Sequence, residues 1–116
     1  MIRAISFTLL VGINLLIPLN FLQLKANNIE NILTPGRNLI LDKNYSEALN
    51  EFNKVIKENP KIWEAFYNRG LTKYNLNNFR GALIDLNEAI KLNPIDWPNS
   101  FYLRGLINNK LQRYDS

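Results

Sequence analysis

Apolar residues between positions 62 and 92 fall into two stripes that each have helical spacing. The first consists of Ile62, Trp63, Phe66, Tyr67, Leu71, Tyr74 and Leu76, and the second of Phe79, Ala82, Leu83, Leu86, Ala89 and Ile90. Recurrence at three or four positions fits one face of a helix better than a strand. The short polar run 75–78 between them predicts a turn. Pro94 lacks a backbone N–H and disfavours helix at the residue before it, so the second helix should stop there.

This helical hairpin is one copy of a repeat with a period of 34 residues. The matching pairs are Gly36 and Gly70, Ala48 and Ala82, and Pro60 and Pro94. A period of this length is typical of stacked helix–turn–helix units. Gly70 and Ala82 have almost no side chain, so we expect the two helix axes of the hairpin to approach closely where these residues face each other.

The spacing predicts about two and a half copies. The first should span residues 29–62 and the second residues 63–96. The third, residues 97–116, repeats the second at an offset of 35 and holds only the first helix of a unit. The sequence therefore predicts an all-α solenoid of helix–turn–helix units.

The first copy departs from the pattern at its beginning, because Thr34 and Pro35 fall where the middle of its first helix should lie. Proline inside a helix costs about 3 kcal/mol, whereas it is tolerated at the first helical position after an N-cap such as threonine. We therefore expect this helix to begin at Pro35 and residues 28–33 to form a separate turn or kinked segment. Asn44 and Glu47 fit a capping arrangement for the next helix.

Residues 63–94 read WEAFYNRGLTKYNLNNFRGALIDLNEAIKLNP and resemble the tetratricopeptide repeat family. The pattern of that family runs aromatic, Leu-Gly, aromatic, then Ala, aromatic, Ala and Pro. The resemblance implies a non-catalytic scaffold in which the first helix of each unit lines a concave groove for a protein or peptide ligand. The groove positions are Glu64, Tyr67, Asn68, Leu71, Tyr74 and Asn75 in the second copy and Tyr102, Leu106 and Asn109 in the third. Tyr74 has an alternative role, in which its ring packs against a neighbouring repeat.

A narrower function within the family fits less well. Some relatives bind the C-terminal carboxylate of chaperones through a clamp of Lys, Asn and Arg. Asn68 matches the clamp asparagine, but Leu33 stands where the lysine of the first copy is expected. In the third copy Asn99 and Leu103 stand where Lys and Arg are needed. The resemblance therefore disfavours a receptor for chaperone tails.

A function of another class is self-association. The chain would then be a structural piece, or a truncated remnant of a longer array, that forms a homodimer through its C-terminal helix. The apolar stripe that a following helix would normally cover consists of Phe101, Leu106, Ile107 and Leu111. An uncovered stripe of this kind tends to attract a partner chain or a second copy.

The N-terminus has the layout of an export signal. A short positive start at Arg3 is followed by a mostly apolar stretch, residues 4–24, and by an acceptable cleavage site at Ala26. The apolar stretch is also about as long as a bilayer requires, although Asn14 and Pro18 interrupt it. Residues 1–26 are therefore interpreted as a cleavable signal, with a retained membrane anchor or a soluble cap helix as alternatives. Either of the first two places the repeats in an exported or membrane-anchored protein.

The composition argues against catalysis. The chain has no histidine and no cysteine, which removes the commonest general base, thiolate nucleophiles and zinc–sulfur sites. Asp85 and Glu88 are close on one helix, but the position of Asp85 suggests an ion pair with Arg69, worth about 0–1 kcal/mol if exposed. We therefore expect no enzyme activity, catalytic residue, cofactor or metal.

The net charge of +4 does not indicate a nucleic-acid partner. A binding stripe would require the basic residues to gather on one face. The lysines of the repeats are scattered over polar helix faces, at Lys54, Lys57, Lys61 and Lys91. Solvated helix surfaces explain them better.

Overall fold

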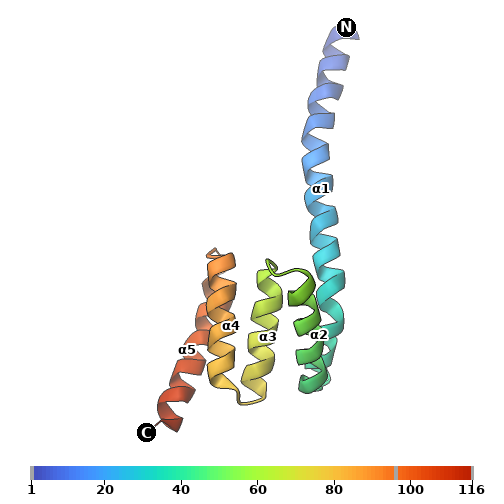
Figure 1. Ribbon diagram of the computed structural model, residues 1–116. Coiled ribbons are helices and arrows are strands. Elements are labelled where there is room, and N and C mark those ends of the chain that lie inside the picture. Colours follow the sequence, from blue (N-terminus) through green and yellow to red (C-terminus); the bar gives the residue numbers. More distant parts are fainter. Residues whose placement is uncertain (1, 96, 116) are drawn as a thin grey trace. The chain divides into compact units, whose positions relative to one another are not determined.

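The structure, a computed structural model, describes residues 2–95 and 97–115, and for residues 2–20 and Trp97 it describes the backbone alone. Its helices in chain order are α1 (Ile2–Leu41), α2 (Tyr45–Glu58), α3 (Trp63–Asn75), α4 (Phe79–Leu92) and α5 (Trp97–Tyr114) (Figure 1). No strand occurs among these described residues. The all-α, repeat-like architecture expected from the spacing is therefore confirmed.

The chain divides into two compact units, residues 1–31 and residues 32–116. The described part of the first unit is helix throughout and belongs to α1. In the part of the chain that the structure describes, no helix is both long enough and apolar enough to cross a membrane. The signal or anchor expected at residues 1–26 lies mostly outside the residues whose side chains are described.

The second unit is a row of helices in chain order. α3 packs against α2, α4 against α3 and α5 against α4, as the successive green, yellow, orange and red ribbons of Figure 1 show. The core of the later helices consists of Phe79, Ala82, Leu86, Leu103 and Ile107. Because α4 supplies three of these residues and α5 the other two, α5 is held on the hairpin by side chains that cover α4.

This packing corrects one expectation about α5. Ile107 is fully buried, and Leu106 and Leu111 are partly buried against the same core. Of the stripe expected to lack a cover, only Phe101 is substantially exposed, at 40%. The expectation was wrong because the apolar side of α5 packs against α4, the helix that precedes it, and α4 therefore covers most of the stripe.

The repeated glycines lie in three different environments. A Cβ atom built on Gly70 would lie 3.3 Å from the carbonyl oxygen of Ala82, which confirms that these residues mark a close crossing of α3 and α4. On Gly36, the same atom would lie 2.6 Å from Cζ of the buried Phe52 in α2. On Gly105 of α5, it would meet nothing within 4 Å.

The expected break at the start of the first copy is absent. α1 continues through Thr34 and Pro35 to Leu41, so Thr34 is not an N-cap and residues 28–33 are not a separate turn. Pro35 is exposed, whereas its neighbours Leu33 and Gly36 are buried against the repeats. Burial of these neighbours holds the backbone helical, and it offsets the hydrogen bond that proline cannot donate.

The loops before α2 and α4 are built alike but capped differently. Lys43 and Asn77, 34 residues apart, both have positive φ, at 60° and 62°. Asn78 caps α4 with a side-chain oxygen that accepts from the N–H of Gly81 at 3.0 Å. Asn44 occupies the same position before α2, as expected, but its side chain makes no capping hydrogen bond.

Candidate peptide-binding groove

A hollow of about 270 Å³ opens between the last turns of α1 and the middle of α3. It is lined by Arg37, Ile40, Leu41, Asn68 and Leu71, all within the second unit. Three of the five lining side chains are aliphatic, and one is a cation. The hollow therefore combines aliphatic side chains with a few polar groups, the usual make-up of a recognition site.

Two of the lining residues are fixed by their own helix. Leu71 is half-buried because it also packs against the core. Asn68 is buried, and its Nδ2 donates to the carbonyl oxygen of Glu64, one turn earlier, at 2.7 Å. These contacts hold the α3 wall of the hollow in one conformation before any ligand arrives.

The other positions predicted in the second copy do not line this hollow. Tyr67 packs against the core, and Glu64 is half-buried on the same helix. The ring of Tyr74 lies 5.6 Å from that of Phe79, so its packing role is the one observed, although within its own hairpin. Asn75 is exposed, and its Nδ2 donates to a backbone carbonyl of α3 at 2.9 Å. Asn68 and Leu71 are the predicted residues that the structure brings together here.

The positions predicted in the third copy also lie away from the hollow. Tyr102 and Asn109 are exposed on α5, and Leu106 is partly buried against the core. None of the three lines the hollow between α1 and α3.

Sequence reasoning missed the α1 wall of the hollow. Arg37, Ile40 and Leu41 precede Leu71, Tyr74 and Asn75 by 34 residues. The same shift that defined the repeat could have found them. Pro35 predicts an irregular first copy and so argues against extending the shift into it, whereas the helix is in fact continuous through this residue.

The position of Leu33 bears on the carboxylate clamp. Its side chain is fully buried in the second unit, so it is inaccessible to a ligand. The leucine here is a core residue, which agrees with the low expectation for a chaperone-tail receptor.

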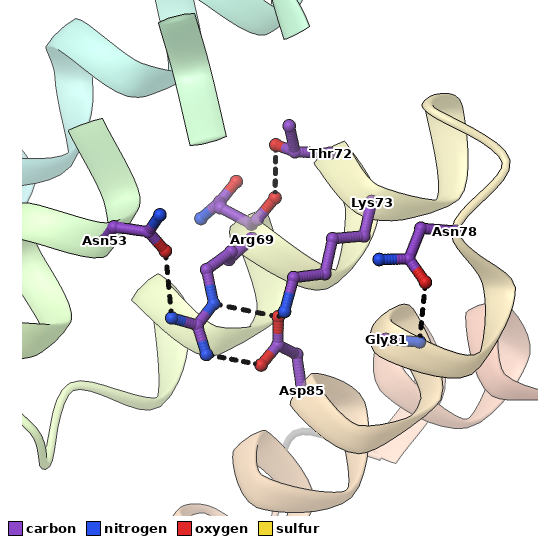
Figure 2. Close-up of polar contacts among 8 residues, drawn as sticks. Asn53, Arg69, Thr72, Lys73, Asn78, Gly81 and Asp85 are labelled. Atoms are coloured by element: carbon purple, nitrogen blue, oxygen red, sulfur yellow. Dashed lines mark hydrogen bonds and ion pairs between the residues drawn. The ribbon is translucent and has the colours of Figure 1, made fainter. Parts of the chain in front are cut away.

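The acidic residue singled out as a structural partner, Asp85, lies in a buried polar network (Figure 2). Its two carboxylate oxygens accept from Nε and Nη2 of Arg69 at 2.9 and 2.6 Å, and Nζ of Lys73 lies 2.8 Å away. Arg69 also donates to the side chain of Asn53 in α2 at 3.0 Å. Asp85 is only 1% exposed, so the expected pair with Arg69 forms at a buried carboxylate, and the network joins three helices.

This network is structural in character. The carboxylate of Asp85 is already bonded to two cations and is closed to solvent, so it has no room for a substrate. Over the described residues, no group of three acidic, histidine or cysteine side chains could hold a metal ion.

A second hollow, of about 510 Å³, lies where α4 begins and α5 ends. Its lining includes Phe79 and Tyr114, whose rings lie 5.5 Å apart, and Arg80, which pairs with Asp115 at 3.4 Å. Both members of this ion pair are largely exposed, so the pair contributes little to stability. The ring of Tyr114 repeats the position of Phe79 but covers it from outside.

Residues 63–96 match the family model of the tetratricopeptide repeat. They span α3 and α4, the hairpin that contains the close glycine crossing and the Asp85 network. This match supports the tetratricopeptide repeat family.

Curated relatives share short regions with the chain. Sperm-associated antigen 1 of Rattus norvegicus is 33% identical over 57 residues, which is 49% of this chain and 6% of that protein. The Homo sapiens protein of the same name is 32% identical over 79 residues, 68% of this chain and 8% of its own length. Protein SGT1 homolog of Dictyostelium discoideum is 37% identical over 60 residues, 52% of this chain and 16% of that protein. The chain therefore spans a small part of each relative's length.

Proposed function

We propose that the chain is a non-catalytic protein-interaction module that holds a segment of a partner protein in the hollow between α1 and α3. The observation that carries this proposal is the hollow itself, in which Ile40, Leu41 and Leu71 supply aliphatic lining. The tetratricopeptide repeat match at residues 63–96 supports the same class of function.

The size and chemistry of the hollow favour a peptide side chain as its occupant. Small-molecule pockets usually have volumes of about 300–1,000 Å³ and enclose most of the ligand. At about 270 Å³ the hollow is smaller, and it suits one apolar side chain of an extended or helical segment. Arg37 adds one cation to the lining of the hollow.

The test is selection of peptides from a displayed random library on the full chain, followed by binding measurements on two matched variants. Leu41 and Ile84 are both exposed aliphatic residues, at 79% and 69%, but Leu41 lines the hollow and Ile84 does not. Leu41→Lys should weaken binding of the selected peptides at least about tenfold, because a cation would replace one of the three aliphatic side chains that line the hollow. Ile84→Lys should leave binding unchanged. Equal effects of the two substitutions would contradict the proposed groove.

We further propose that residues 1–26 direct export and are removed. This rests on the sequence pattern of a positive start, an apolar stretch and a small residue at the cut. Mass spectrometry of the protein from its host should find an N-terminus at or near Asn27. A retained membrane anchor would leave Met1 in place in a membrane fraction. Intact Met1 in a soluble cytosolic fraction would contradict export altogether.

A further inference from the structure

The same small set of residues occurs on α3 and on α5. Arg69 and Gly70 on α3 correspond to Arg104 and Gly105 on α5, at the offset of 35 residues. Each arginine donates through Nη1 to an asparagine of an earlier helix: Arg69 to Asn53 at 3.0 Å, and Arg104 to Asn87 at 3.3 Å. The two guanidinium groups are therefore anchored in equivalent ways.

On α3, a second helix packs over these residues. α4 lies across Gly70, with the carbonyl oxygen of Ala82 at 3.3 Å from the place of a glycine Cβ. Three residues after Ala82, the carboxylate of Asp85 meets the guanidinium of Arg69. An alanine at the crossing and an aspartate three positions later are thus what this surface binds.

On α5 the corresponding positions are empty. No atom lies within 4 Å of the Cβ position of Gly105. Among the residues that the structure describes, Arg104 forms no ion pair with a carboxylate. Its guanidinium carbon lies 4.5 Å from the ring centroid of Phe101, one turn earlier on the same face. Asn87 and Phe101 hold Arg104 in position, but no carboxylate among the described residues pairs with it.

We propose that this face of α5 is a docking surface for one amphipathic α-helix of a partner protein, with a small residue over Gly105 and an aspartate that pairs with Arg104. Charge complementarity decides the occupant, since an oriented, half-buried cation with no carboxylate selects an acidic helix. This surface is distinct from the hollow between α1 and α3 and does not depend on the function proposed for it.

A second copy of the chain does not supply such a helix. The alanine and aspartate of α4 are already buried against α3. In α2, Ala48 is fully buried, and the corresponding acidic residue, Glu51, pairs with Lys54 at 2.9 Å. The partner helix must therefore come from a segment outside the five helices of this fold.

The sequence of α4 provides the probe. A synthetic peptide of residues 77–93, and the same peptide with Asp85→Asn, would be titrated into the isotope-labelled full chain and followed by NMR. The first peptide should shift the signals of Gly105 and of Arg104 Nε. The Asp85→Asn peptide should bind at least about tenfold more weakly, because a charge-assisted hydrogen bond is lost.

Two variants of the chain test where the peptide binds. Gly105→Leu should abolish binding without lowering the melting temperature, because the space beside Gly105 is open. Asn99→Leu is the control, since Asn99 is an exposed residue of α5 outside the proposed face, and binding should persist.

A short peptide forms little helix alone, so the same sequence would also be attached after Ser116 through a flexible linker. The attached helix should raise the melting temperature, and Asp85→Asn within the attached copy should remove most of the gain. Equal behaviour of the two sequences in both assays would overturn the proposal. It would also be overturned by signal shifts at Gly70 in place of Gly105, or by concentration-dependent dimerisation that Gly105→Leu abolishes, because a second copy would then be the occupant.

Discussion

The helices α3 and α5 both carry an arginine followed by a glycine, but the surroundings of these two pairs differ. On α3, Gly70 lets α4 approach, and Arg69 is paired with a buried aspartate. On α5, Gly105 faces open space, and the described structure gives Arg104 no carboxylate. The comparison teaches that this motif stabilises the fold only where a second helix covers it. Uncovered, the glycine weakens its helix, and the arginine is left with neutral partners, Asn87 and the ring of Phe101.

The strongest test of this comparison is a substitution of Asp85, the buried carboxylate that pairs with Arg69. Asp85→Asn would leave Arg69 and Lys73, which are largely buried, without their counter-charge. Breaking a buried pair costs roughly 3–5 kcal/mol, and we expect about 3 kcal/mol because both cations keep 19% exposure. Urea unfolding followed by circular dichroism would measure the loss.

The matched control for Asp85 lies three residues further along α4. Glu88 pairs with Lys91 at 3.7 Å on an exposed surface, so Glu88→Gln should change stability by no more than about 0.5 kcal/mol. Similar losses for the two substitutions would show that burial of Asp85 does not determine its energetic role.

The next largest effect should separate the two glycines. Gly70→Leu would force bulk against the Ala82 carbonyl and Leu86, and overpacking of this kind costs about 1–3 kcal/mol. Gly105→Leu would extend into open space and should not destabilise the chain. Thermal melts of both variants would compare them directly, and a shift of about 4–8 °C is expected per kcal/mol in a unit of this size. Equal melting temperatures would mean that α3 and α4 do not cross closely at Gly70.

The helices and the close crossing at Gly70 could be predicted from sequence, because glycine, alanine and proline recur at a fixed period. Each of these residue types has a known local effect on a helix. The pairing of Arg69 with Asp85 could also be predicted, but its burial could not, since that depends on Lys73 and Asn53 converging from two helices. The covering of Ile107 by α4 was missed for a related reason. Helical spacing shows which residues share a face but not which neighbour that face turns toward.

The groove was only partly predictable. Asn68 and Leu71 were found on α3, but the opposite wall depends on α1 remaining helical through Pro35. Proline carries a strong local penalty, and burial of Leu33 and Gly36 offsets it through contacts that no local rule contains.

A smaller effect should distinguish the two hairpin entrances. Asn78→Ala removes an N-cap hydrogen bond to Gly81 and should cost about 1 kcal/mol. Asn44→Ala removes a side chain that makes no such bond and should cost only a few tenths of that. Both changes in the free energy of unfolding would be measured from the shift of the urea midpoint, with the slope of the transition unchanged. A loss at Asn44 as large as that at Asn78 would show that the α2 cap forms in solution.

The last effect we predict has the opposite sign. Gly105→Ala should stabilise the chain by about 0.5–1 kcal/mol, because alanine is the better helix former and nothing lies near the added methyl group. Gly70→Ala gains the same helix propensity, but its methyl group would lie 3.3 Å from both the Ala82 carbonyl oxygen and Cγ of Leu86, so the crossing must open slightly. The difference between the two alanine variants therefore measures the cost of the crossing with propensity cancelled. If both variants were stabilised equally, α4 would have room to give at Gly70. If Gly105→Ala were destabilising, some other part of the molecule would already cover the face of α5 in solution.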